Sequence, residues 1–265
     1  MTSAADANLR TPEPAARALE AIWHEVECGR YHADLPLWRE LAATASADGA
    51  PARVLDLGAG IGRVTLDLAG AGHELTAVDI SPGLLEELAR RAAGLPVETV
   101  AGDIRELSLS RRGFDLCVVP MQTIQLLGGE SQRRALFAGA AAHLRKGALL
   151  ACAIVTQAEE FDSLAGQLGP SPDRMELGER VFFSRPLSVE VLPNRIRIER
   201  ERVVLPGDGP ERWNEGSEHD IVELDRVSEE QLWREAQDAG LRAEPTRLID
   251  ETDEHTASEV VVLRA

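Results

Sequence analysis

The architecture of this chain is set by one stretch, Val54-Leu55-Asp56-Leu57-Gly58-Ala59-Gly60-Ile61-Gly62-Arg63. It begins as a short apolar strand, turns through alternating glycines, and continues as an apolar helix pattern. Gly58 and Gly60 carry no Cβ, so the backbone can turn tightly and come close to a ligand. The helix behind the turn presents free N–H groups and the positive end of its dipole. A strand, a glycine turn and a helix in this order predict a nucleotide-binding loop.

Apolar strand segments alternate with helix patterns on both sides of this turn. Strands are expected at 53–57, 74–78, 97–101, 114–119 and 148–155, with helices at 61–71, after Ser81-Pro82 and at 132–144. A capping box, Ser228-Glu229-Glu230-Gln231, begins a further helix that ends at Gly240. Strands at 241–249 and 258–263 complete the pattern. Alternating strands and helices indicate βαβ units, and the fold class predicted is α/β, with a doubly wound, mostly parallel sheet.

The two remaining regions differ from this pattern. Two helices are expected at the N-terminus, one introduced by Thr11-Pro12 and one over 35–45. Apolar and charged residues alternate at 180–184, 188–192, 195–205 and 220–226, which is typical of strands with one buried face. Four parts are predicted: an N-terminal helical lid (1–50), a core (51–155), an inserted antiparallel β cap (156–227) and a C-terminal helix with strands that complete the core sheet (228–265).

The net charge of −17 is concentrated in the second half of the chain. Residues 1–155 carry 19 acidic and 15 basic side chains, whereas residues 156–265 carry 26 and 13. Such a chain repels a phosphate backbone, so nucleic acid is not expected as a substrate. No apolar run approaches the length of a membrane helix and no secretory signal is visible. The three cysteines are scattered, which favours free thiols and a cytoplasmic location.

The glycine spacing distinguishes two kinds of nucleotide loop. A dinucleotide fingerprint beginning at Gly58 would place its third glycine at position 63, where this chain has Arg63. Glycines at 58, 60 and 62, with Asp56 two positions before them, resemble motif I of class I S-adenosylmethionine-dependent methyltransferases. The segments 114–119 and 143–150 also resemble the family's fourth strand and its approach to the fifth. The resemblance covers residues 50–155 and, by pattern, 228–265, and it implies a seven-stranded, Rossmann-like methyltransferase sheet.

The resemblance implies a set of cofactor-binding residues. Asp79 lies about 20 residues past the glycines, where an acid can accept both ribose hydroxyls. Family members use the acid corresponding to Asp103 for the adenine amino group, with the next apolar side chain against the ring. Asp56 should be buried, and it either bonds loop N–H groups or lies near the methionine amino group. The full set expected to bind S-adenosylmethionine is Asp56, Gly58, Ala59, Gly60, Asp79, Ile80, Gly102, Asp103, Ile104, Pro120 and Met121.

The acceptor is expected beyond the carboxyl ends of strands four and five, beside the loop that begins at Pro120. Related amine methyltransferases often have a histidine in this loop, whereas this chain has Gln125 as its polar candidate. Gln125 either orients the acceptor or satisfies local backbone groups. Tyr31 and His32 resemble part of a family lid, which implies that Tyr31 contacts the sulfonium end and that His32 is a reserve base. Either residue is otherwise a helix-boundary residue.

The sequence thus predicts a methyltransferase that uses S-adenosylmethionine without a metal to methylate nitrogen or oxygen of a small molecule. The inserted segment is expected to form the acceptor pocket, a homodimer contact, or both. The arginines of this segment either serve an anionic acceptor or, as the alternation at Arg195, Arg197, Arg200 and Arg202 favours, form a solvated strand face. Two alternatives stay open: a non-catalytic S-adenosylmethionine-binding protein that acts through a partner, and a nicotinamide-dependent oxidoreductase.

Overall fold

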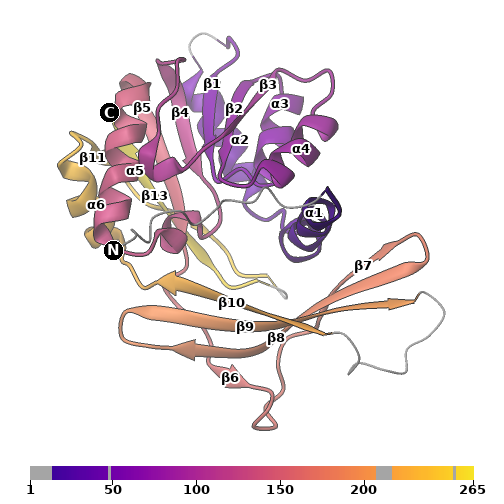
Figure 1. The fold of residues 1–265 in the computed structure, drawn as a ribbon. Coiled ribbons are helices and arrows are strands. Elements are labelled where there is room, and N and C mark those ends of the chain that lie inside the picture. Colours follow the sequence, from indigo (N-terminus) through magenta and orange to yellow (C-terminus); the bar gives the residue numbers. More distant parts are fainter. Residues whose placement is uncertain (1–13, 47–48, 207–216, 253–254) are drawn as a thin grey trace, which may run out of the picture.

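The computed structural model describes residues 14–46, 49–206, 217–252 and 255–265, and it contains two β-sheets (Figure 1). The larger sheet has the strand order β11-β13-β5-β4-β1-β2-β3, and β12 pairs with β13. Strands β1 to β5 are parallel and β13 is antiparallel to β5. Their bounds are β1 Arg53–Leu57, β2 Glu74–Asp79, β3 Val97–Ala101, β4 Phe114–Val119, β5 Leu144–Ile154, β11 Arg242–Ala243, β12 Arg247–Ile249 and β13 Ser258–Arg264. The predicted α/β fold with a mostly parallel sheet is confirmed.

Helices cover both faces of this sheet (Figure 1). One core cluster joins α2 and α3 to a face of the sheet, and a second joins α5 and α6 to the opposite face. The elements are α1 Pro14–Cys28, α2 Leu35–Ala45, α3 Arg63–Gly70, α4 Pro82–Arg91, α5 Glu130–His143 and α6 Glu229–Gln237, with short 3-10 helices η1 Ile104–Glu106 and η2 Thr123–Leu127. Coverage on both faces explains why the strands are almost entirely apolar.

Local signals placed two helix starts correctly, whereas α6 ends at Gln237 and not at the expected Gly240. The Ser81 and Ser228 hydroxyls accept hydrogen bonds from the third residue of α4 and α6, so both predicted caps are confirmed. The cap expected at Thr11-Pro12 lies outside the described residues. The strand expected at 241–249 is interrupted, because β11 and β12 are separated by a segment that contains Pro245, which has no N–H for a ladder bond.

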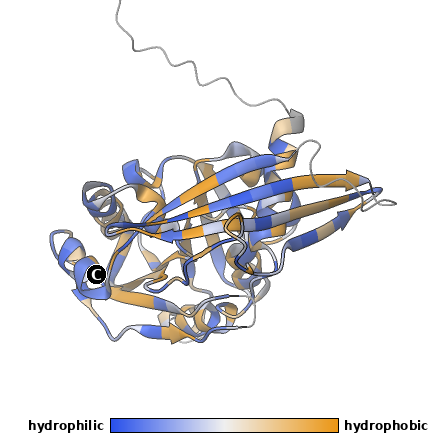
Figure 2. Cartoon of the chain, turned by 90° about the horizontal axis from the view of Figure 1, so that it is seen from below, coloured by the Kyte–Doolittle hydropathy of each residue, from blue (hydrophilic) through white to orange (hydrophobic). Residues whose placement is uncertain are grey.

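The smaller sheet, the cap, lies within the segment 156–227 that follows β5. Its strands are β6 Phe161–Asp162, β7 Asp173–Leu177, β8 Arg180–Val191, β9 Arg195–Pro206 and β10 Glu218–Asp225, all paired antiparallel. The two runs expected at 180–184 and 188–192 form one strand, with a register shift between Pro186 and Ser188. Strands β6 and β7 are additional to the prediction. Figure 2 shows apolar and polar residues alternating along the long strands, as a sheet with one buried face requires.

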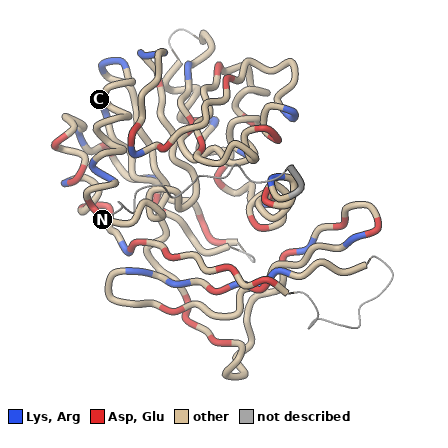
Figure 3. The backbone as a smooth tube through the Cα atoms, viewed as in Figure 1, with Lys and Arg blue, Asp and Glu red and all other residues tan. Residues whose placement is uncertain are grey.

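The cap lies beside the carboxyl ends of the parallel strands, against α1 and η2 (Figure 1). Figure 3 shows acidic and basic residues interspersed along its strands, and ion pairs such as Arg195 with Glu223 and Arg202 with Asp220 join neighbouring strands. No helix in the described residues has the length and apolar character needed to cross a membrane. In open α/β folds, ligands bind at the carboxyl ends of the parallel strands, and in this protein those ends face the cap.

Candidate active site

A cavity of about 340 Å³ lies between the carboxyl ends of the core strands and the cap. Three parts of the chain enclose it: the glycine loop with the start of α3, the segment after β4, and a wall made by α1 and the cap. Its lining residues are His24, Glu27, Cys28, Asp56, Gly58, Ala59, Arg63, Val64, Pro120, Met121, Gln122, Thr123, Leu126, Ile198, Arg200, Val222 and Leu224. Five predicted cofactor residues, Asp56, Gly58, Ala59, Pro120 and Met121, are therefore brought together here.

The glycine loop is shaped for close approach, but its N–H groups are already in use. Gly58 and Gly60 have φ values of 76° and 56°, which favour glycine. The N–H groups of Gly58 and Ala59 donate to the carbonyl oxygen of Val78 at 2.8 and 3.1 Å. Gly60 N–H donates to Asp79 Oδ2 at 2.8 Å. The loop therefore contributes its shape to a ligand more than it contributes donors from these three residues.

Asp56 is buried, with 1% of its surface exposed. Its Oδ2 accepts a hydrogen bond from Thr65 Oγ1 at 2.6 Å. Because the N–H groups of residues 58–60 donate elsewhere, the alternative in which Asp56 bonds them is wrong. Oδ1 is buried and has no hydrogen-bond partner among the described residues. Burial raises the pKa of Asp56 to about 6, so this carboxyl group fits a cationic donor supplied by a ligand.

Asp79 ends β2 directly beside the glycine loop. Its two carboxylate oxygens accept hydrogen bonds from Gly60 N–H and Ser81 N–H, and the Gly102 N–H donates to its carbonyl oxygen at 2.9 Å. The ends of β2 and β3 are thus joined at this point. Ile80, the next residue, is 67% exposed although it is a large apolar side chain. The role of these residues in cofactor binding stays a prediction.

Asp103 lies at the start of η1 and has a partner of its own. Its carboxylate accepts from the Arg105 backbone N–H and from the Arg105 guanidinium, with the shortest contact at 2.6 Å. These bonds from Arg105 hold the pKa of Asp103 below its usual range. Ile104 is buried in the core. An adenine contact by Asp103 and Ile104 stays a prediction, and it would have to coexist with the Arg105 ion pair.

Met121 follows β4 in an unusual backbone conformation. Its φ of 53° is the only positive value at a non-glycine residue within the described part of the chain. Such a conformation costs on the order of 1–3 kcal/mol and persists where the surroundings enforce it, often at ligand sites. The Thr123 hydroxyl donates to the Pro120 carbonyl at 2.9 Å and fixes the turn. This strained turn brings the segment after β4 against the glycine loop.

Arg63 connects the N-terminal helices to the glycine loop. It forms two hydrogen bonds with the buried Asp34 carboxylate, at 2.5 and 2.7 Å, and its guanidinium lies 5.1 Å from the centre of the Tyr31 ring. Tyr31 is buried and packs against His255. Burial raises the pKa of Tyr31. Tyr31 contacts the cavity residue Arg63, and His32 is exposed to solvent. Neither residue lines the cavity, and the roles expected for them stay predictions.

Gln125 also requires a correction. It is completely buried, with 0% exposure, and it does not line the cavity. Its amide bonds Val155 and Asp225, where the cap joins the core. The interpretation that it satisfies backbone groups is therefore the one the structure supports, although those groups are 30 and 100 residues away.

His24 is a site residue that the sequence reasoning missed. It lies on α1, lines the cavity, and packs so closely on Gly60 that a Cβ at that glycine would collide with its ring. Burial lowers the pKa of His24, against smaller opposing effects of nearby acids such as Asp79. Its Nδ1 is buried without a partner among the described residues. His24 is thus a neutral imidazole with an unused nitrogen, and no local sequence signal distinguishes it from an ordinary helix residue.

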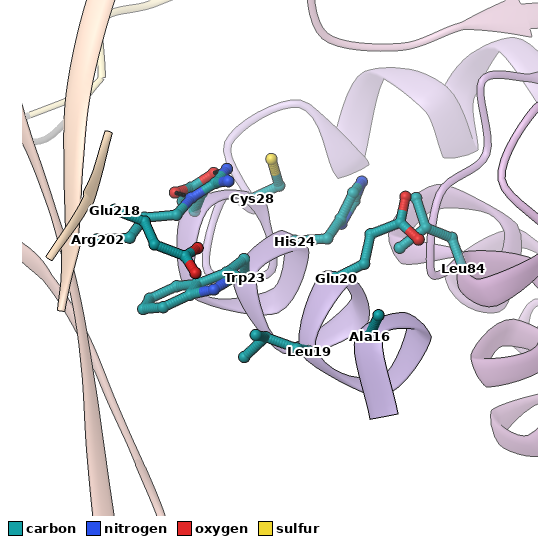
Figure 4. Close-up of a pocket in the computed structure, with 10 residues that line it drawn as sticks. Ala16, Leu19, Glu20, Trp23, His24, Cys28, Leu84, Arg202 and Glu218 are labelled. Atoms are coloured by element: carbon teal, nitrogen blue, oxygen red, sulfur yellow. Dashed lines mark hydrogen bonds and ion pairs between the residues drawn. The ribbon is translucent and has the colours of Figure 1, made fainter. Parts of the chain in front are cut away.

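A second cavity, of about 360 Å³, adjoins the first around the same helix (Figure 4). Figure 4 shows Trp23 extending from α1 towards Arg202 and Glu218 of the cap, while His24 and Glu20 leave the helix on the side of Leu84. The two cavities share His24, Glu27 and Cys28 as lining residues. Burial raises the pKa of the Cys28 thiol to about 11, so it stays protonated. One turn of α1 therefore separates the two hollows.

Two cap arginines are not part of a solvated face, which corrects that interpretation. Arg202 holds the Glu27 carboxylate with two bonds of 2.7 Å, and Arg200 lines the cavity while pairing with Asp173. Burial alone would raise the pKa of Glu27, but bonds from Arg202 and Ser184 outweigh it and lower the pKa. Even-numbered residues of β9 face α1, so Arg200 and Arg202 fall on the same face as Ile198.

Comparisons with known proteins agree with this geometry. A family model described as a methyltransferase domain matches residues 54–147. A cypemycin N-terminal methyltransferase from a Streptomyces species is 36% identical over 115 residues, which cover 43% of this chain and 45% of that protein. The matched part is thus less than half the length of this curated relative.

Solved structures resemble nearly the whole chain. An S-adenosylmethionine-bound amino pentose methyltransferase from Micromonospora echinaspora has a TM-score of 0.67 at 19% identity, covering 93% of this chain and 96% of that one. A sugar N-methyltransferase from a Streptoalloteichus species has a TM-score of 0.65 at 17% identity, covering 99% and 97%. At these identities the likeness shows a shared fold. The resemblance inferred from the glycine loop is confirmed over residues 54–147, which match the methyltransferase-domain model, and the whole chain shares the fold of these methyltransferases.

Proposed function

We propose that this protein transfers the methyl group of S-adenosylmethionine to an amine nitrogen of a small molecule. When bound, S-adenosylmethionine supplies a methyl group already activated on a sulfonium. Asp56 would hold its ammonium group, the glycine loop would lie against it, and Asp79 would hold the ribose. The cap (156–227) would form the outer wall of the acceptor pocket, and the N-terminal helices (1–50) would form a lid over the cofactor.

The observation that carries the proposal is that Asp56 lines the cavity while its buried Oδ1 has no hydrogen-bond partner among the described residues. A buried carboxylate oxygen without a donor is costly, so a ligand that supplies a cationic N–H recovers that cost on binding. S-adenosylmethionine carries an ammonium group, and Asp56 is the cavity-wall carboxylate with an oxygen that has no partner among the described residues, whereas Glu27 is held by Arg202.

The hydrogen bonds of the glycine loop bear on the oxidoreductase alternative. A pyrophosphate at such a turn is held by backbone N–H groups. Here the N–H groups of Gly58, Ala59 and Gly60 already donate within the protein and are not available to a pyrophosphate. A nicotinamide dinucleotide is therefore the weaker candidate.

The acceptor side supports nitrogen chemistry. Neutral His24 lies in the cavity wall and can take the proton that an amine must lose before its lone pair can react. Ile198, Val222 and Leu224 give the pocket an apolar wall that excludes water. Three relatives named above act, by their names, on an amino pentose, on a sugar nitrogen and on a peptide N-terminus.

The test is direct. Purified protein is titrated with S-adenosylhomocysteine by calorimetry, and then incubated with S-adenosylmethionine and a panel of amino sugars, peptide amines and matching hydroxyl compounds. We expect binding heat and release of S-adenosylhomocysteine with amines only. Absence of binding by a folded protein would refute the proposal. Binding without turnover on any acceptor would favour the non-catalytic alternative, and turnover of hydroxyl compounds would refute N-methylation.

The pH dependence of cofactor binding provides an independent prediction. Asp56 must be ionised to pair with an ammonium, and burial raises its pKa to about 6 in the empty protein. Binding therefore releases a proton below that pH, and the affinity for S-adenosylhomocysteine should fall about tenfold per pH unit below pH 6. Between pH 7 and 8 it should be flat. Calorimetry in buffers of different ionisation enthalpy measures both effects, and equal affinities at pH 5 and 7.5 would contradict the prediction.

A further inference from the structure

Gln125 lies where the inserted cap meets the core, and its side chain contacts both connections. The chain leaves the core at Val155, directly after β5, and returns at Asp225, the last residue of β10. Gln125 Oε1 accepts a hydrogen bond from the Val155 N–H at 2.8 Å. Its Nε2 donates to the carbonyl oxygens of Val155 and Asp225 at 3.0 and 2.9 Å. One buried amide thus holds the two ends of the insertion together.

The return connection is also fixed from its other side. The Asp225 carboxylate accepts from Gly129 N–H at 2.6 Å and from Arg133 Nη1 at 2.5 Å. Arg133 is itself buried and makes two bonds to Glu235 of α6, at 2.7 and 2.8 Å. The segment from η2 into α5 therefore supplies Gln125, Gly129 and Arg133, three residues that bond this end of β10.

The clamp and the cavity belong to the same two segments. Pro120 to Thr123, directly before Gln125, line the core side of the cavity, and Val222 and Leu224, directly before Asp225, line the cap side. Val222 and Leu224 are two positions apart in β10 and therefore lie on the same face of the strand. A shift of Asp225 relative to η2 would move both of their side chains. The width of the pocket therefore depends on the contact between Gln125 and Asp225.

We propose that Gln125 is a positioning residue that sets the cap at its working distance from the active site. The description of that space as an acceptor pocket rests on the proposed function, whereas the clamp itself does not. Gln125 acts through Leu224 and Val222 on the acceptor side and leaves the glycine loop untouched. Loss of the amide should loosen the cap and spare the cofactor site.

Hydrogen exchange of the full-length protein, followed by mass spectrometry, tests the clamp. Gln125→Met keeps the shape of the side chain but removes all three hydrogen bonds. Amides of β10 should exchange at least about tenfold faster than in the unchanged protein, while amides of β4 change by less than about twofold. Gln237→Met, at an exposed glutamine of α6, is the matched control and should alter neither. The dissociation constant of S-adenosylhomocysteine should stay within about threefold in both variants.

A second variant distinguishes a clamp from general destabilisation and covers the case in which the first does not fold. Gln125→Glu places a carboxylate opposite two carbonyl oxygens, but when protonated its O–H can donate to one of them. Relative to the unchanged protein at each pH, its cap exchange should be fast at pH 8 and should return towards normal at pH 5. Equal exchange of cap and core, or no pH-dependent recovery, would overturn the inference. Failure of the unchanged protein to bind S-adenosylhomocysteine would refute the proposed function alone.

Discussion

Asp56→Asn is expected to weaken binding of S-adenosylmethionine and S-adenosylhomocysteine by roughly 10- to 150-fold. Hydrogen bonds to a charged group contribute about 1.5–3 kcal/mol, and 1.4 kcal/mol is a factor of ten in affinity. The substitution keeps an oxygen for the Thr65 hydroxyl but removes the charge that would pair with the cofactor ammonium. Calorimetry at pH 7.5 measures the change.

The same substitution should not destabilise the empty protein at pH 7.5. Burial raises the pKa of Asp56 from an ordinary value of 3.8 to about 6 in the folded state. The folded protein therefore binds the proton more tightly than the unfolded chain. The stability from this group is fully present below pH 4 and is lost as the pH rises through 6. Asparagine is neutral throughout, so the variant should be as stable as the unchanged protein or more stable above pH 6.

Asp115→Asn provides the matched control. Asp115 is the second residue of the neighbouring strand β4 and so lies at the end of the sheet opposite the cavity. It accepts hydrogen bonds from Arg53 N–H at 2.8 Å and from Arg145 Nε at 2.6 Å. Its loss should lower the melting temperature and leave cofactor affinity unchanged. If Asp56→Asn lowered the melting temperature and left cofactor affinity unchanged, as expected for Asp115→Asn, Asp56 would have only a structural role.

The core could be predicted because its information is local. The strand β1, the helix α2 and the capped starts of α4 and α6 follow from patterns within about ten residues. The glycine loop adds a positional signal, since Gly58 and Gly60 occupy backbone conformations that other residues rarely adopt. Asp56 and the loop were assigned to one site for the same reason: strand and turn are adjacent in the chain.

The acceptor side could not be predicted because its contacts are distant in the chain. Gln125 was considered as an acceptor residue because it follows β4, but its partners, Val155 and Asp225, are 30 and 100 residues away. Arg200 and Arg202 were interpreted as solvent-exposed. The alternation in β9 shows that its two faces differ in polarity, but it does not show which element packs against each face. Glu27 of α1, which binds Arg202, is 175 residues away.

His24→Ala is expected to lower the turnover number by roughly 10²- to 10⁴-fold, the usual contribution of a positioned proton acceptor. Burial lowers the pKa of His24, so the imidazole is neutral at pH 7 and able to accept a proton. His24 lines the cavity, and its buried Nδ1 has no partner among the described residues. The affinity for S-adenosylhomocysteine should change much less than turnover, because Asp56 and the glycine loop are untouched. Turnover with the best amine of the panel, measured at saturating cofactor, gives the comparison.

His32→Ala is the control, since His32 is the exposed histidine of the same N-terminal region and should tolerate the change. The ring nitrogen signals of His24, followed by NMR, should titrate below pH 6.5, and the acid limb of turnover should follow that titration, because protonation removes the base. A His24→Ala variant with normal turnover, or with cofactor binding and turnover reduced in equal proportion, would show that His24 only shapes the cofactor site against Gly60. Proton transfer would then have to pass directly to solvent, and the acid limb of the rate profile would be that of the acceptor amine itself.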